Sequence, residues 1–299
     1  MNDAAAANDE RRRATLIGSG AVLIWGTLAV LTTATGDVPP FELVALSFVI
    51  GSVLAHAKWL IRGESVMRAW RQPARAWALG LGGLFGYHFC IFLALKSAPP
   101  AEANLINYLW PLLIVLFAAL LPGERLRAGH VAGALAGFAG AALLVTRGGS
   151  LGFDAAHAAG YGAALAAAVL WSGYSVASSR LASVPTDAVG AFCLGTAILA
   201  GLAHLALERT VVPGAGEWLA ILALGIGPVG GAFFLWDWGL KRGSVRALGA
   251  IAYAAPLIST GLLIAFGKAE PSAAIAAAGL LIVGGAALAA GDLFLGRRG

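Results

Sequence analysis

The chain has 299 residues, of which 59% are hydrophobic and only 12% charged, and its formal net charge at pH 7 is +5. A soluble domain of this size carries about 25% charged residues, so this composition and a mean hydropathy of +0.82 exclude an ordinary soluble protein. They predict an all-α integral membrane protein. The pI of 9.6 is explained by the placement of charges in loops, so no nucleic-acid partner is expected.

Ten apolar segments, each about as long as the ~20 residues that a helix needs to cross a bilayer, follow one another along the chain. The predicted spans are 14–34, 41–60, 76–95, 101–121, 131–146, 158–177, 188–207, 218–240, 247–266 and 273–291. The first follows three arginines, as a signal peptide would, but its length and the nine further spans indicate a retained helix.

The basic residues of the loops predict the orientation of these spans. With the N-terminus placed in the cytoplasm, 16 of the 20 Lys and Arg residues fall on the cytoplasmic side. The four left outside are Lys96, Arg147, Arg209 and Lys268. Because positive charge concentrates on the cytoplasmic side, we expect both tails, 1–13 and 293–299, in the cytoplasm.

The two halves of the chain repeat each other at an offset near 145 residues. Trp25 and Pro39 are separated by 14 positions, as are Trp171 and Pro185. Farther on, "FLALKSAPPAEANLINYLWP" parallels "DWGLKRGSVRALGAIAYAAP". The repeats, 14–147 and 148–292, hold five spans each, so the second must be inverted. Inverted five-helix repeats are typical of secondary transporters and place the site near the midplane, within one structural unit.

The fourth span carries a polar stripe. Asn104, Asn107, Tyr108 and Pro111 recur at i, i+3, i+4 and i+7, which places them on one helix face, with Trp110 beside it. Pro111 has no N–H, so it breaks the helix and leaves the carbonyl of Asn107 as a free acceptor. The stripe predicts a binding surface; the alternative is that the amides bond neighbouring helices.

Pro256 is the counterpart of Pro111 in the second repeat and predicts a second helix break, which leaves the carbonyl of Ala252 free. Further candidates for substrate contact are aromatic residues near the midplane, where a buried polar ring atom needs a partner. They are Trp25, Trp171, Tyr87, Tyr174 and Tyr253. Helix packing is the alternative explanation for each of them.

Among ionisable residues, His88 lies deepest in a span, where such a group is a functional candidate. It either bonds a substrate carboxylate or carries a proton; a bond to a neighbouring helix is the alternative. Asp237 lies one turn before Lys241 and predicts an i,i+4 ion pair. No metal-ligand cluster, phosphate-binding loop or nucleophile with a base occurs, so neither a metal, a cofactor nor an enzyme is expected.

The paired blocks "FLALKSAPPAEANLINYLWPLLIVLFAALLPGERL" and "FFLWDWGLKRGSVRALGAIAYAAPLISTGLLIAFGKAEP" resemble the EamA-type domain of the drug/metabolite transporter superfamily. The core from Ile106 to Pro111 further resembles bacterial aromatic amino acid exporters. The resemblance implies a basket of ten helices that exports amino acids or similar metabolites from the cytoplasm across the bacterial inner membrane. Many relatives carry an Arg in the second span where this chain has Ser47 and Phe48, so no substrate contact is carried over from it.

The sequence therefore predicts an exporter of amino acids with aromatic or apolar side chains, which alternates access around a midplane cavity. The substrate ring would rest on Tyr108 and three tryptophans, with Asn107 and His88 near its charged groups. The bilayer and a small-molecule substrate are the expected partners, with no obligatory protein partner. Alternatives are a broad drug or metabolite exporter, an intramembrane enzyme, a passive channel and a sensor scaffold.

Overall fold

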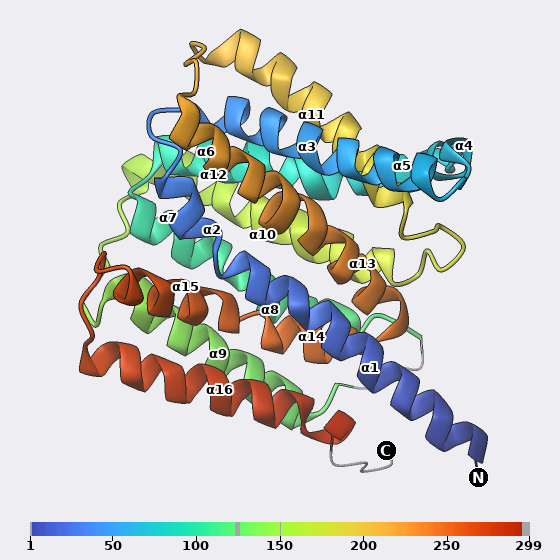
Figure 1. Ribbon diagram of the computed structural model, residues 1–299. Helices are drawn as coiled ribbons and strands as arrows, with labels where there is room; N and C mark the ends of the chain where they lie inside the picture. The colour runs from blue at the N-terminus through green and yellow to red at the C-terminus, as the bar shows by residue number, and fades with distance from the viewer. Residues whose placement is uncertain (1, 123–125, 150, 295–299) are drawn as a thin grey trace.

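The computed structural model describes residues 2–122, 126–149 and 151–294 (Figure 1). All regular structure in these residues is helical, with no strand, which confirms the all-α prediction. The helices lie roughly parallel in one bundle, with the N-terminus at one end.

The first half of the chain contains ten of these helices. They are α1 (Asn2–Trp25), α2 (Leu28–Thr33), α3 (Pro40–Ile61), α4 (Val66–Trp70), α5 (Ala74–Leu81), the π-helix η1 (Gly82–Gly86), α6 (Tyr87–Ser97), α7 (Pro100–Asn107), α8 (Leu109–Ala118) and α9 (Ala128–Thr146). The second half contains the short 3₁₀ helix η2 (Ala155–His157), α10 (Ala158–Ser178), α11 (Ala188–Leu207), α12 (Ala215–Ile226), the π-helix η3 (Gly227–Gly231), α13 (Ala232–Arg242), α14 (Val245–Ile251), α15 (Ala254–Ala265) and α16 (Ala273–Phe294).

Within the described residues, nine helices are long and apolar enough to cross a membrane. They correspond to nine of the predicted segments; the remaining segment, 158–177, forms α10. This helix is 21 residues long but rich in Ala, Gly and Ser, and about half of it is buried against neighbouring helices. Because α10 faces protein more than lipid, it needs less hydrophobic surface than an outer helix.

Five of the described long helices are interrupted within their length. The α1–α2 pair breaks at Gly26 and Thr27, α7–α8 at Tyr108, and α14–α15 at Ala252 and Tyr253, whereas η1 and η3 interrupt the other two. The α7–α8 and α14–α15 breaks fall three residues before a proline, whose ring clashes with the carbonyl four positions earlier. Interruptions at membrane depth are tolerated where they are buried in protein or line a cavity.

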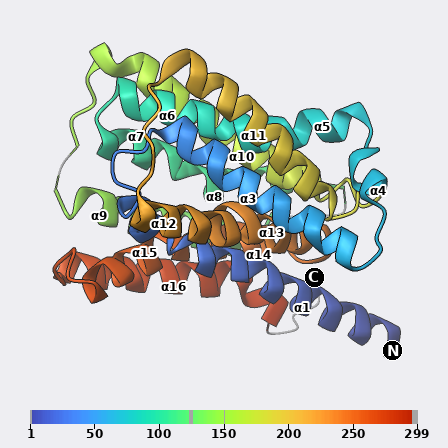
Figure 2. The same cartoon turned by 45° about the horizontal axis from the view of Figure 1, so that its top comes forward.

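Helices from the two halves of the chain lie side by side: α1 with α13, α3 with α11, and α9 with α16 (Figures 1 and 2). Glycines allow several of these close approaches. A Cβ at Gly18 of α1 would lie 2.8 Å from the Cα of Gly239, and one at Gly51 of α3 would lie 2.9 Å from the Cα of Gly230. The two halves therefore pack closely against each other, and the main cluster of buried side chains among the described residues draws on both.

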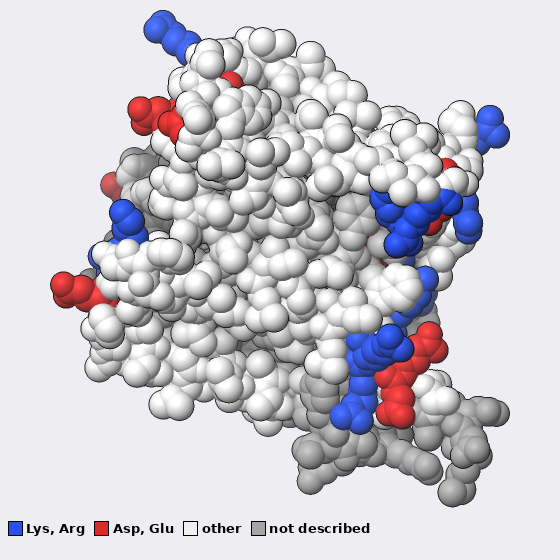
Figure 3. All heavy atoms as spheres, viewed as in Figure 1, with Lys and Arg blue, Asp and Glu red and all other residues white. Residues whose placement is uncertain are grey.

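Charged side chains are confined to the two ends of the bundle in the view of Figure 3. Lys and Arg gather at the end that carries the N-terminus, whereas the opposite end shows few basic side chains mixed with acidic ones. The apolar band between the ends is the surface that a bilayer would cover.

Candidate functional site

A cavity of about 790 Å³ enters the bundle from the end opposite the N-terminus, on the left in Figure 1. The exposed lining residues Thr32, Gly36 and Lys96 mark its mouth, and the mostly buried Trp110 and Trp171 form its floor. Parts of α2, α3, α6, α7 and α15 surround it. Its volume is in the range of small-molecule sites, ~300–1,000 Å³.

The floor is an aromatic cluster. The ring of Trp25 contacts Trp171 and Trp110 edge to face, with centroids 5.7 Å and 6.3 Å apart, and its Nε1 donates to the carbonyl of Pro228 at 3.0 Å. Below it lies Trp236, which is fully buried and donates to the hydroxyl of Ser175. Edge-to-face pairs are the favoured geometry of aromatic rings. These rings seal the cavity from the end that carries the N-terminus.

The polar groups of the floor leave hydrogen-bonding capacity unused. Asn107 donates from Nδ2 to the hydroxyl of Tyr87 at 3.4 Å, while its Oδ1 is buried without a partner among the described residues. The hydroxyl of Ser47, which also lines the cavity, is buried and likewise has no partner among the described residues. An unsatisfied buried polar atom costs about 1–3 kcal/mol, so both atoms gain by meeting a polar ligand.

His88 lines the cavity with one nitrogen already engaged. Its Nδ1 donates to the carbonyl of Leu84 at 2.6 Å, and its ring meets Phe48 and Tyr87 edge to face at 5.4 and 5.2 Å. A carbonyl only accepts, so this bond places the proton of a neutral imidazole on Nδ1. Nε2 is then an acceptor.

Of the described lining residues, only Lys96 at the mouth carries a full charge, and none is acidic. A cationic group in the cavity would therefore meet neutral acceptors and the faces of aromatic rings, which attract cations. A carboxylate would find its one charged partner near the entrance.

The structure brings seven predicted contact residues together on the cavity surface: Trp25, Tyr87, His88, Asn107, Tyr108, Trp110 and Trp171. Pro256 and Asn104 also line the cavity. Tyr174 does not; it is 3% exposed and lies behind the floor, against Trp171. Tyr253 and Pro111 are likewise buried away from the cavity.

Tyr253 lies instead at the break between α7 and α8. Its hydroxyl accepts from the N–H of Leu112 at 3.2 Å and donates to the carbonyl of Tyr108 at 3.1 Å. The sequence singled out the carbonyl of Asn107 at this break; the acceptor that the structure engages is the carbonyl of Tyr108.

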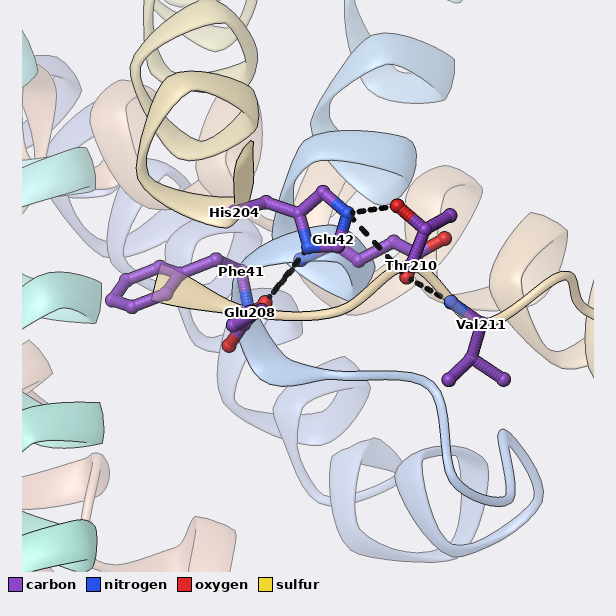
Figure 4. Close-up of polar contacts among 6 residues, drawn as sticks. All are labelled: Phe41, Glu42, His204, Glu208, Thr210 and Val211. Carbon is purple, nitrogen blue, oxygen red and sulfur yellow. Dashed lines mark hydrogen bonds and ion pairs between the residues drawn. The ribbon is translucent and has the colours of Figure 1, made fainter. Parts of the chain in front are cut away.

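A buried polar network near the mouth was not anticipated from the sequence (Figure 4). His204 bonds the carboxylate of Glu208 through Nδ1 at 3.0 Å and the hydroxyl of Thr210 through Nε2 at 2.9 Å, and lies 3.8 Å from Glu42. Glu208 also accepts from the N–H groups of Phe41 and Glu42, in the first turn of α3. An anion there complements the helix dipole.

Two features of the sequence signal this network in retrospect. Glu42 stands in the first turn of an apolar span, and His204 and Glu208 are spaced i,i+4 at the end of another. Only the pairing of α3 with α11 brings them together. The predicted ion pair between Asp237 and Lys241 is present at 2.7 Å, and Lys241 also donates to the carbonyl of Val184.

Interrupted helices around an aromatic-floored cavity that is open at one end are features of secondary transporters. The family model described as the EamA-like transporter family matches residues 12–146 and again 158–291. The chain belongs to this family, as its blocks predicted. It is a multi-pass inner-membrane transporter and not an enzyme.

Known relatives are similar over nearly the whole chain. An aromatic amino acid exporter YddG of Ancylobacter novellus is 58% identical over 280 residues, which cover 93% of this chain and 97% of that protein. The exporter of the same name from Salmonella typhimurium is 25% identical over 84% of this chain and 87% of its own. A crystal structure of a protein 57% identical in sequence superposes with a TM-score of 0.90 and covers 96% of this chain and 100% of that one.

Proposed function

We propose that this protein exports amino acids with aromatic or apolar side chains, by alternating access around the cavity. The observation that carries this proposal is the cavity itself, with aromatic rings and neutral polar atoms on its floor. The similarity to an aromatic amino acid exporter over 93% of the chain supports the same substrate class.

The polar atoms suit the two ends of a zwitterion. Asn107 Oδ1 and His88 Nε2 accept hydrogen bonds, as an ammonium group requires, and the hydroxyls of Tyr87 and Ser47 can donate to a carboxylate. The side chain of the substrate would rest on the indoles of Trp25, Trp110 and Trp171 and the ring of Tyr108. Tyr174 and Tyr253 would support this surface from behind without touching the substrate.

We place the cavity between two inverted five-helix repeats, 14–147 and 148–292, with α10 as the sixth of ten spans. The family model that matches twice, over 12–146 and 158–291, supports the duplication. Five spans in each copy require the inversion. The basic end of the bundle (Figure 3) would face the cytoplasm with both termini, since positive charge concentrates there, and the cavity would then open outward.

The test is efflux from right-side-out membrane vesicles loaded with labelled phenylalanine. Vesicles that contain the protein should lose phenylalanine faster than vesicles without it, and excess unlabelled tryptophan should slow the loss. The same protein with Trp25→Ala serves as a control for leakage. Unchanged efflux of every amino acid tested would refute the proposal.

A broader export activity is the second candidate, because a cavity of about 790 Å³ leaves room for solutes larger than phenylalanine. Competition distinguishes the two. Inhibition of phenylalanine efflux by unrelated drugs as strongly as by tryptophan would favour the broad exporter, whereas inhibition by apolar amino acids alone would favour the first.

A further inference from the structure

The hydroxyl of Tyr253, in the second half of the chain, bonds the backbone of the first half at the α7–α8 break. Residues 108 and 112 would bond to each other in a regular α-helix. Tyr253 instead contacts both groups, accepting from the N–H of Leu112 at 3.2 Å and donating to the carbonyl of Tyr108 at 3.1 Å. Its side chain is fully buried, so no water competes for these bonds.

The ring of Tyr253 packs against Gly137 of α9, where the absence of a side chain leaves room for it. A Cβ added at Gly137 of α9 would press on the ring, with Cγ only 2.9 Å away. The ring also packs against Ala141 and Ile282. The hydroxyl is therefore held from behind and has little freedom to leave the break while this packing persists.

This contact bears on the cavity because the break carries cavity residues. Asn107 ends α7, Tyr108 forms the break and Trp110 lies in the first turn of α8, and all three line the cavity. A change in backbone geometry between residues 108 and 112 would move all three groups. The hydroxyl of Tyr253 thus helps to fix the positions of these three residues, although it does not line the cavity.

The equivalent contact in the other repeat is missing. The repeat aligns Tyr253 with Tyr108 and Pro256 with Pro111, so Leu257 corresponds to Leu112. Tyr108 lines the cavity, half-buried, and its hydroxyl bonds to none of the described residues. In the described part of the chain, no side chain bonds the carbonyl of Tyr253 or the N–H of Leu257. The repeat would allow a tyrosine hydroxyl at each of the two helix breaks, and among the described residues the structure has one only at the α7–α8 break.

We propose that Tyr253 is a positioning residue that acts in one state of the transport cycle. Its hydroxyl holds the α7–α8 break while the cavity is open at the Lys96 end. When the cavity opens at the other end, Tyr253 leaves, and Tyr108 bridges the carbonyl of Tyr253 and the N–H of Leu257. This inference rests on the alternating access of the proposed function, since two inverted repeats exchange conformations between the two states.

The exchange is unequal. The positions in α16 that correspond to Gly137 are 282 and 283, which hold isoleucine and valine. No glycine therefore stands in α16 at the position that would leave room for the ring of Tyr108, as Gly137 does for Tyr253. We expect the loss of the Tyr253 hydroxyl to shift the equilibrium between the two states more than the loss of the Tyr108 hydroxyl.

The test measures thiol accessibility at two matched positions. Thr32 is exposed at the cavity mouth, and its repeat counterpart Ser178, 146 residues later, is 4% exposed at the closed end. Each is replaced by cysteine in a background with Cys90→Ala and Cys193→Ala. The labelling rate with a small polar thiol reagent then reports which end is open. The parent should label at position 32 much faster than at 178.

Tyr253→Phe keeps the ring and removes only the hydroxyl. It should raise the labelling rate at position 178 by about two- to tenfold, the effect of one net hydrogen bond on the equilibrium between the two states. The rate at position 32 should fall by less, because the state that exposes it is the dominant one. Tyr108→Phe should change both rates by less and in the opposite direction. Opposite signs for a matched pair would not arise from general loosening of the fold.

Unchanged rates in Tyr253→Phe, a rise at both positions, or a shift of the same sign in Tyr108→Phe would overturn the inference. If Tyr253→Phe does not give a monodisperse protein, Gly137→Ala, which displaces the ring, must shift the rates as Tyr253→Phe is expected to. Efflux of phenylalanine by the unmodified protein is measured separately. Its absence would refute the proposed function, whereas the labelling rates decide the role of Tyr253.

Discussion

The two ends of the bundle are held together in different ways. At the mouth, α3 and α11 are joined by charged groups, because Glu208 accepts from the first turn of α3 and bonds His204. At the closed end, the partly exposed ion pair of Lys58 with Asp187 joins α3 to the start of α11, whereas α1 and α13 meet through close glycine approaches, such as Gly18 against Gly239, beside buried indoles. The buried ion pair there, Asp237 with Lys241, lies within a single helix, α13.

This difference indicates which contacts a transport cycle can break. Separation of a buried carboxylate from its hydrogen-bond donors leaves an uncompensated charge, and each hydrogen bond to a charged group contributes about 1.5–3 kcal/mol, whereas glycine contacts and aromatic edges separate without such a charge. The closed end therefore suits a gate that opens in every cycle. The pair α3 and α11, with its ionic network, suits a unit that moves as one body.

The largest effect is expected at the floor, where cavity and closed end meet. Trp25→Ala removes a ring that lines the cavity and contacts Trp110, Trp171 and Trp236. Burial of an aromatic side chain supplies about 1.5–3 kcal/mol, and the substrate ring would lose much of it. Phenylalanine efflux should therefore fall about tenfold, the equivalent of ~1.4 kcal/mol. Trp218→Ala, at a surface position that is 40% exposed, should transport normally. Equal losses in both variants would contradict a floor made by Trp25.

The next largest effect tests the packing of the closed end. Gly18→Ala places a methyl group 2.8 Å from the Cα of Gly239, and overpacking of this kind costs about 1–3 kcal/mol. The midpoint of thermal unfolding in detergent should fall. Gly173→Ala, in α10 with no atom within 4 Å of the added methyl group, is the matched control. It should keep or raise the midpoint, because alanine favours helices; a fall as large as that of Gly18→Ala would disprove the packing argument.

A smaller loss is expected when the mouth network is weakened. Glu208→Gln retains an acceptor but removes the charge that faces the first turn of α3 and His204. Hydrogen bonds to charged groups contribute about 1.5–3 kcal/mol and neutral ones about 1 kcal/mol, so stability should fall by about 1 kcal/mol. Arg209→Gln, at the exposed neighbouring position, is the control. An unfolding midpoint equal to that of the unmodified protein would show that the charge does not join the two helices.

The smallest effect concerns the cavity wall between the two ends. Ser47→Ala removes a buried hydroxyl that has no partner among the described residues, so the variant should be as stable as the unmodified protein or slightly more so. If the hydroxyl meets the substrate carboxylate, the KM for phenylalanine should rise about two- to tenfold, the worth of one hydrogen bond. A KM that does not change would remove Ser47 from the proposed site.

The sequence predicted those features that a helix expresses within its own segment. Apolar length predicted the spans, and the i, i+3, i+4 stripe predicted that Asn107 and Tyr108 share a face, which the structure places on the cavity. The breaks at Pro111 and Pro256 fall at the turn before each proline, as the missing N–H and the ring clash require.

Features that depend on a partner helix could not be predicted. Tyr253 and Tyr108 occupy matching positions in the repeat, yet one is buried in a break and the other lines the cavity. Their own segments contain no signal for this difference, because it arises from the neighbouring helices. The run "GLGGLFG" at residues 80–86 contains the π-helix η1, and Gly83 in it lies against Tyr174. Nothing in that run distinguishes a π-helix from a regular turn, because the contact with Tyr174 comes from another helix.

The pairing of α1 with α13 has a consequence for the making of the protein. Gly18 and its contact Gly239 are separated by 221 residues (239 − 18). At ~5–20 residues per second, a ribosome needs roughly 10–45 s to synthesise the chain between them. During that interval the first helix rests in the bilayer with its glycine face against lipid or an insertion factor. The bundle is therefore completed late in synthesis, and a ribosome that stalls between the two halves would leave a product in which α1, α3 and α9 lack their partners α13, α11 and α16.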